Sequence, residues 1–172
     1  MQFVILGLLM IAPMSLYDLH KQFAAGPSLF YSASFGSLQR ALRQLIAQGW
    51  VTVTDASSSG RRRNLHTPTD EGVEAWRAWM REPLAGAHAE TSMLAKVFLL
   101  GLLPRGGERA AALGELRRSA AAGLAELRAV ADGLDAAQIP DEFAEIFAYQ
   151  GATLDYGLRS HELALSWLDG LD

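Results

Sequence analysis

The sequence predicts a mainly α fold that contains one short β-ribbon. Apolar residues recur at steps of three and four along most of the chain, which is typical of amphipathic helices. The run WVTVTD at residues 50–55 instead alternates as a half-buried strand does, and the turn ASSSG follows it before a second short run, RRRNLHT. Helices followed by a two-stranded ribbon and a further helix form the pattern of an α+β winged helix.

Two helices are expected before the ribbon is reached. Residues 3–12 predict a hydrophobic helix that ends at Pro13, and Ser15 is expected to cap a second helix that ends at Gly26 and Pro27. The twelve-residue apolar run FVILGLLMIAPM is too short to span a bilayer and has no cationic segment typical of a signal peptide. We therefore expect a cytoplasmic protein.

The third helix, from Ser34 as N-cap to Gly49 as stop, has two distinct sides. The expected buried side consists of Phe35, Leu38, Leu42, Leu45 and Ile46. The expected exposed side consists of Gly36, Arg40, Arg43 and Ala47, with Gln44 at its edge. Small residues let a helix backbone approach a partner closely, and the arginine fork suits phosphate oxygens or the guanine edge. This side is therefore a candidate DNA-reading surface.

Three consecutive arginines, Arg61, Arg62 and Arg63, stand at or just after the ribbon turn. A charge run is usually solvated surface. Here it follows a helix that already exposes two arginines, which favours a nucleic-acid contact. After the ribbon, Thr69 is expected to cap a fourth helix whose inward residues are Val73, Trp76 and Met80.

The second half of the chain predicts helices only. A linker is expected at residues 84–89, followed by helices at roughly 90–103, 107–136 and 141–169. The last two helices carry apolar seams that suggest coiled-coil-like packing, either within one chain or between two. The expected domains are a winged helix DNA-binding domain at 1–83, the linker, and a C-terminal helical dimerisation and effector domain at 90–172.

The charge is divided unevenly along the 172 residues, whose net charge is −4. Residues 1–83 hold eight Lys/Arg against six Asp/Glu, a balance of +2, whereas residues 84–172 hold seven against thirteen, a balance of −6. Within residues 15–66 six cations face two anions, a balance of +4. The basic character is therefore local, as a DNA-docking face requires.

Composition and motifs exclude several classes of function. The chain has no cysteine, which rules out disulfides, thiolate zinc sites and cysteine nucleophiles. It also lacks a nucleophile elbow, a P-loop and a dinucleotide fingerprint, and its four histidines are scattered, so we expect no enzyme, no cofactor and no metal. The remaining alternative is a helical protein–protein interaction module, which leaves the arginine ribbon unexplained.

Three stretches resemble the PadR-type transcriptional regulators of bacteria: ILGLLMIAPMSLYDL, SASFGSLQRALRQLIAQGWV and GRRRNLHTPTDEG. Weaker similarity continues in ETSMLAKVFLLG and HELALSWL. The resemblance implies an N-terminal winged helix-turn-helix joined to a C-terminal helical dimerisation domain. It also implies a homodimer that represses promoters on double-stranded DNA and is released by a small molecule, whose identity does not follow from the family.

The chain departs from the family pattern at two places. Gln39 and Arg40 stand where the family often has Tyr-Pro, so the operator is expected to differ. His66 and Pro68 stand where the second strand often has Tyr and Leu. Because proline cannot donate to a strand ladder, we expect this strand to end by Thr67.

The site residues expected from these patterns fall into two sets. The DNA-binding set is Ser15, Tyr17, Ser34, Ser37, Gln39, Arg40, Arg43, Arg61, Arg62 and Arg63. For Ser15 and Tyr17 the alternative is that the serine only caps its helix and the tyrosine only packs. The candidate contacts for a small aromatic effector are Trp79, His161 and Trp167, with core packing or a local hydrogen bond as the alternative role.

Overall fold

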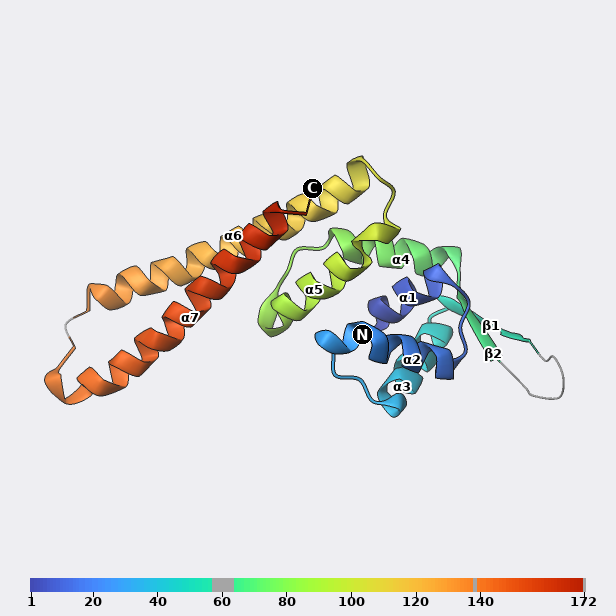
Figure 1. Ribbon diagram of the computed structural model, residues 1–172, viewed down its shortest axis with the longest axis horizontal. Coiled ribbons are helices and arrows are strands. Elements are labelled where there is room, and N and C mark those ends of the chain that lie inside the picture. The colour runs from blue at the N-terminus through green and yellow to red at the C-terminus, as the bar shows by residue number, and fades with distance from the viewer. Residues whose placement is uncertain (57–63, 138, 172) are drawn as a thin grey trace. The chain divides into compact units, whose positions relative to one another are not determined.

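The computed structural model describes residues 1–56, 64–137 and 139–171, and they divide into two compact units. The first unit is Met1–Glu82 with Gly86–Ala112, and the second is Pro83–Ala85 with Leu113–Asp172. The first contains α1 (Gln2–Ile11), α2 (Leu16–Ala25), η1 (Pro27–Leu29), α3 (Phe35–Ala47), β1 (Val51–Asp55), β2 (Asn64–Pro68), α4 (Asp70–Arg81), η2 (Gly86–His88), α5 (Ala89–Leu99) and η3 (Leu100–Leu102) (Figure 1). The expectation of a mainly α fold with a winged helix is confirmed.

The core of the first unit is built around α1, which is buried on nearly all sides. Its buried apolar side chains are Val4, Ile5, Leu6, Leu8 and Leu9. A helix that is apolar all round belongs in the interior, and α1 indeed packs against α2, α3, α4, α5 and β2. Gly7 admits the close approach of α5, since a Cβ there would lie 2.6 Å from Leu99 Cδ1.

The capping predictions for α2 and α3 are confirmed. The Ser15 hydroxyl accepts a hydrogen bond from the Asp18 backbone N–H at 3.3 Å, and the Asp18 carboxylate accepts one from the Ser15 N–H at 3.1 Å, which completes a capping box. The Ser34 hydroxyl accepts from the Ser37 N–H at 3.2 Å. Gly49 follows α3 with φ of 75°, a conformation that favours glycine.

Two residues of α3 do not lie where the periodicity placed them. Leu38, Leu42 and Leu45 are buried as expected, but Phe35 is 45% exposed and Ile46 is 36% exposed. Both stand about 60 to 100° around the helix from Leu38 and Leu45, at the margin of the buried stripe. Ala41, on the other side of that stripe, is buried instead, because a small residue fits where α3 packs closely.

The strands β1 and β2 form an antiparallel ribbon whose register pairs Val51 with Pro68 and Asp55 with Asn64. The expectation that β2 ends by Thr67 is wrong by one residue. The Thr69 N–H donates to Trp50 O at 3.0 Å, so the next pair inward, Val51 with Pro68, is one of the alternate pairs that exchange no backbone hydrogen bonds. The missing N–H of proline therefore costs the ribbon nothing at this position.

The N-terminus of α4 holds the base of the ribbon. Thr69 Oγ1 accepts from the Gly72 N–H at 3.1 Å and donates to Gly49 O at 2.8 Å. A Cβ at Gly72 would lie 2.2 Å from Trp50 O, so only glycine allows α4 to approach the ribbon this closely. Trp76 and Met80 are buried as predicted, and Val73 is half-buried.

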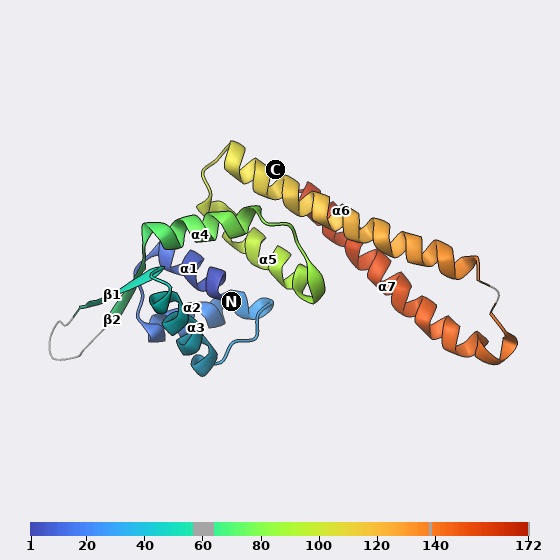
Figure 2. The same ribbon diagram turned by 180° about the vertical axis from the view of Figure 1, so that it is seen from behind.

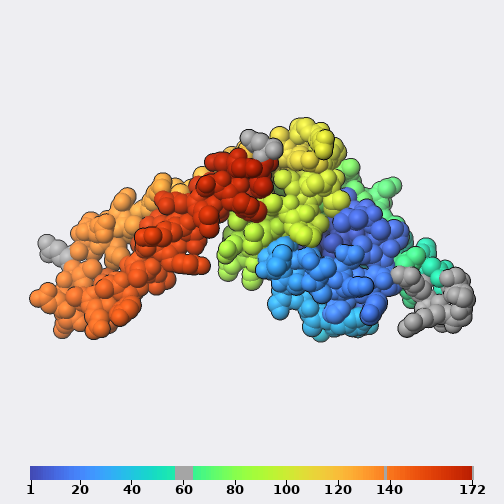
Figure 3. Space-filling view, viewed as in Figure 1, coloured from blue at the N-terminus to red at the C-terminus, as the bar shows by residue number. Residues whose placement is uncertain are grey.

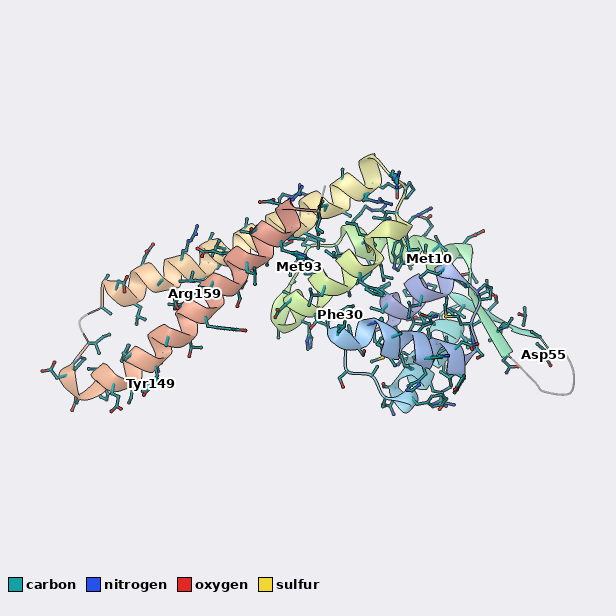
Figure 4. The ribbon with its side chains drawn as sticks, in the orientation of Figure 1. Met10, Phe30, Asp55, Met93, Tyr149 and Arg159 are labelled. Atoms are coloured by element: carbon teal, nitrogen blue, oxygen red, sulfur yellow. The ribbon has the colours of Figure 1, made fainter. Side chains whose placement is uncertain are left out.

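The helix α5 belongs to the first unit by its contacts, although the sequence assigned residues 90–103 to the C-terminal region. Lys96 on α5 is 1% exposed, donates to Glu82 O, and lies 5.4 Å from the ring centre of Trp79 on α4. Figure 4 labels Met93 on α5 and Met10 on α1. How the chain divides into functional domains stays a prediction.

The second unit is a helical hairpin of α6 (Gly107–Asp135, from Leu113 on) and α7 (Ala144–Asp169), with η4 (Asp141–Phe143) before α7. The two helices run side by side in both views (Figure 1) (Figure 2). A Cβ at Gly123 would lie 2.9 Å from His161 Nε2, and Arg128 pairs with Glu162 at 2.9 Å. The predicted helices at 107–136 and 141–169, and their packing within one chain, are thus confirmed. Among the described residues, no helix combines the length and apolar character that crossing a bilayer requires.

Candidate nucleic-acid interface

The exposed side of α3 carries the residues that the sequence placed there. Gly36, Gln39, Arg40, Arg43, Gln44 and Ala47 are all exposed. The buried leucines of α3 fix the rotation of the helix against the core, so this side faces outward by default. Within the described residues, no heavy atom lies within 4 Å of a Cβ built on Gly36, outside its chain neighbours and its own helix backbone. The backbone of the first turn of α3 is therefore open to close approach.

The serines at the two helix starts have defined hydrogen-bonding roles. The Ser37 hydroxyl donates to Ser34 O at 2.8 Å, and the Ser15 hydroxyl donates to the Asp18 carboxylate at 2.6 Å. Each hydroxyl keeps lone pairs that can accept, but its single proton is engaged within the protein. Tyr17, in contrast, is largely exposed on the first turn of α2. The start of α2 therefore offers an anion the Tyr17 phenol and backbone N–H groups, rather than the Ser15 hydroxyl proton.

The described part of the ribbon ends where Asp55, which Figure 4 labels at the end of β1, pairs with Asn64. The predicted wing residues Arg61, Arg62 and Arg63 lie outside the described residues. The direction of the ribbon is nevertheless set at its base, where Thr69, Gly72 and the Trp50 carbonyl meet.

His66 is a residue of the interface scaffold that sequence reasoning treated only as a departure from the family. It is buried in β2 and forms an isolated bridge with Met14, in which each backbone N–H donates to the other carbonyl, at 2.9 and 3.2 Å. Its Nδ1 also lies 2.9 Å from Met14 O, which can only accept, so Nδ1 carries the proton. Met14 directly precedes the Ser15 cap, and His66 therefore links the ribbon to the start of α2.

The three candidate effector contacts are not gathered in one unit. Trp79 belongs to the first unit, where its ring stacks on Phe3 at 5.1 Å and 9° beside the buried Lys96. His161 and Trp167 lie on α7. The Nδ1 of His161 lies 2.9 Å from Gly157 O, which agrees with the alternative of a local hydrogen bond. Trp167 is 38% exposed.

A second apolar stripe runs along α7, outside its seam with α6. It consists of Ile146, Tyr149, Tyr156, Leu163 and Trp167, all of them exposed. Their steps of three, seven, seven and four residues keep one side of a helix over six turns. The surface of α7 is the orange-to-red part of Figure 3, and Figure 4 labels Tyr149 on it. The sequence contains this stripe as a second heptad pattern. The stronger apolar pattern of the residues that pack against α6 obscured it.

Within the described part of the chain, no three or more His, Asp or Glu side chains are grouped so that they could hold a metal ion.

No family model and no curated protein matches the sequence. Among solved structures, the chain is similar to Bacillus subtilis PadR in complex with operator DNA, with 22% identity and a TM-score of 0.47 over 99% of this chain and 95% of that chain. It is similar to the PadR-like transcriptional regulator BC1756 from Bacillus cereus, with 22% identity and a TM-score of 0.43 over 98% and 93%. It is also similar to the Vibrio cholerae virulence activator AphA, with 22% identity and a TM-score of 0.42 over 98% and 94%. PadR is the family that the sequence motifs resemble.

Proposed function

We propose that this protein is a DNA-binding transcriptional regulator, which binds a pseudo-palindromic operator as a homodimer and represses promoters until a small molecule releases it. The observation that carries the proposal is the exposed side of α3. It presents Arg40 and Arg43 beside Gln39 and Gln44 on a helix whose opposite side is locked into the core by three leucines. Arginine and glutamine are the side chains that read guanine and adenine edges in the major groove.

The neighbouring elements fit the same role. The first turn of α2, with the backbone N–H groups of Leu16 and Tyr17 at the start of the helix and the exposed Tyr17 side chain, suits a phosphate on one side of the groove. The ribbon base, held by Thr69 and Gly72, would direct Arg61, Arg62 and Arg63 to phosphates or into the flanking minor groove. In this scheme α3 specifies the sequence, whereas α2 and the wing fix its orientation.

The second copy of the chain would cover the outer stripe of α7. Five large apolar side chains on one side of a single helix form a patch that a monomer rarely leaves in water. Heptad spacing keeps the stripe on one side of α7, where it could pack against a partner helix, and a two-fold interface would join this same patch of both copies. A two-fold protein predicts two half-sites related by the same symmetry.

The proposed release by a small molecule centres on Trp167. Of the three candidate contacts, Trp167 is the one on the outer stripe of α7. An aromatic ligand bound there would change the geometry of the dimer. A ligand acts only if it prefers one dimer geometry over another. Titration of phenolic acids, followed by tryptophan fluorescence and operator binding together, tests this, and fluorescence changes without any change in operator affinity would contradict it.

Gel shifts over a salt series test the DNA-binding function. Duplex selected from a randomised pool is compared with random duplex, using the wild-type chain and an Arg40→Ala variant. If α3 reads bases, the wild-type prefers the selected duplex, and the variant loses more affinity on selected than on random DNA. A chain that stays monomeric and binds neither duplex would favour the alternative of a helical interaction module.

A further inference from the structure

Phe35 is an exposed aromatic residue at the first position of α3, and none of the roles given above uses it. The periodicity assigned it to the core, yet 45% of the residue is exposed. Its ring meets the His20 ring of α2 edge-on, with centroids 5.5 Å apart and planes at 63°. The ring is therefore supported on one side by α2 and open to solvent on another.

The position of Phe35 on α3 places it next to the base-reading side. With about 100° between successive residues, Phe35 lies about 40° from Gln39 and 80° from Arg43 around the helix axis. Both of those residues are exposed. Phe35 also directly precedes Gly36, where the first turn is open to close approach. The N-terminal residues of a recognition helix are the ones that reach base edges in the major groove.

We propose that Phe35 reads the C5-methyl group of thymine in the operator, and that His20 holds its ring in position. This inference rests on the proposed DNA-binding function. The thymine methyl is the apolar feature that the major groove offers, and phenylalanine is among the side chains that contact it. The polar groups of the neighbouring Gln39, Arg40 and Arg43 recognise bases through hydrogen bonds, which a methyl group cannot form, so Phe35 adds a contact of a different kind to the same helix. Its half-open position leaves ring surface that a methyl group can bury.

Replacing thymine by deoxyuridine removes the methyl group and changes nothing else, and this provides the test. Duplexes selected from a randomised pool by the wild-type full-length protein are remade with deoxyuridine at each thymine in turn. We expect one thymine per half-site at which the replacement weakens binding by about fourfold, the value of burying roughly one methyl group. Phe35→Ala and Phe35→Ser should bind thymine and deoxyuridine duplexes equally at that position, whereas the wild-type does not.

Ile46 supplies the matched control, because it lies about 20° from Phe35 around the axis but at the opposite end of α3. Ile46→Ala should keep the full thymine preference. His20→Ala should reduce this preference without abolishing binding to the deoxyuridine duplex. Circular dichroism verifies that each variant is folded.

The outcomes separate this inference from the proposed function. If no sequence is enriched from the pool, the DNA-reading function itself fails. If a sequence is enriched but no thymine methyl affects wild-type binding, the role of Phe35 is overturned. It is also overturned if folded Phe35→Ala and Phe35→Ser variants retain the fourfold preference, since another residue then reads the methyl group.

Discussion

At the residue scale, the side chain of His66 adds a hydrogen bond to the backbone bridge that joins β2 to Met14. Its Nδ1–H and its backbone N–H both donate to Met14 O, each at 2.9 Å, so one buried carbonyl receives two hydrogen bonds from one residue. Because the carbonyl precedes the cap of α2, this pair of bonds aligns two elements that the proposal places on DNA.

His66→Leu should destabilise the protein by about 1–3 kcal/mol, since it removes the donor and leaves the acceptor with one bond in a buried place. His66→Asn is the matched control, because the asparagine amide nitrogen occupies roughly the place of Nδ1 and should restore most of the loss. Chemical denaturation measures both. Equal loss in the two variants would mean that ring packing, and not the hydrogen bond, is what matters.

Gly72→Ala should destabilise by about 1–3 kcal/mol or more, because the added Cβ would meet Trp50 O at 2.2 Å and would have to displace backbone. Gly133 in α6 is the control, since among the described residues no atom outside its own helix backbone and chain neighbours lies within 4 Å of a Cβ built there. Gly133→Ala should instead stabilise the protein by about 1 kcal/mol through helix propensity. Thermal unfolding of both variants gives the comparison, and a harmless Gly72→Ala would contradict the close approach of α4 and the ribbon.

Capping residues were predictable at this scale, and the roles of Phe35 and His66 were not. Ser15, Ser34 and Thr69 cap helices through bonds to residues three positions along the chain, so the sequence contains all of the required information. His66 acts on Met14, which is 52 residues away, and Phe35 depends on how α2 crosses α3. Local patterns do not encode such contacts.

At the element scale, α3 is the part of the molecule that the proposal depends on most. Arg40→Ala should cost on the order of 1–3 kcal/mol of operator affinity and relax specificity at one base pair, if the guanidinium pairs with a guanine edge. Binding to a panel of single-base operator variants measures this. A uniform loss on operator and random duplex would instead assign Arg40 to a phosphate.

The outer stripe of α7 leads to a prediction about assembly. Leu163→Glu should raise the dimer dissociation constant at least about tenfold, because burying a carboxylate in an apolar dimer interface costs more than about 1.4 kcal/mol. Ala148→Glu adds the same charge at an exposed position on another side of α7 and should leave the dimer intact. Sedimentation velocity over a concentration series separates the two, and identical behaviour of both variants would remove the stripe from the interface.

At the scale of the whole molecule, charge is divided in a way that the net value of −4 conceals. The basic residues of 15–66 belong to the elements proposed for DNA, and the second half of the chain is acidic. The affinity for DNA should therefore depend steeply on salt in spite of the negative total.

Replacing one wing arginine, as in Arg62→Ala, should weaken binding to all duplexes. It should also flatten the slope of log affinity against log salt by up to about 1.8, because a dimer loses two phosphate contacts that contribute about 0.9 each. Titrations between low and moderate salt measure the slope. An unchanged slope would mean that this arginine does not neutralise phosphate.

The helices of both halves were predictable from periodicity, but their grouping was not. The predicted ranges 107–136 and 141–169 match α6 and α7 closely, since each range has its own seam and breakers. Periodicity states that α5 has an apolar side without stating what covers it, and α5 packs in the first unit with Lys96 buried against α4. The buried charge itself lowered the apparent hydrophobicity of the side that packs.

The most direct test of the central claim is to sequence the DNA that the purified full-length protein retains from its own genome. The proposal predicts a small set of sites that share a pseudo-palindrome, with half-sites separated by about one helical turn of roughly 10 base pairs or a multiple of it. Retained DNA with no common sequence, or no retained DNA at all, would contradict the account of α3 as a sequence-reading helix in a two-fold dimer.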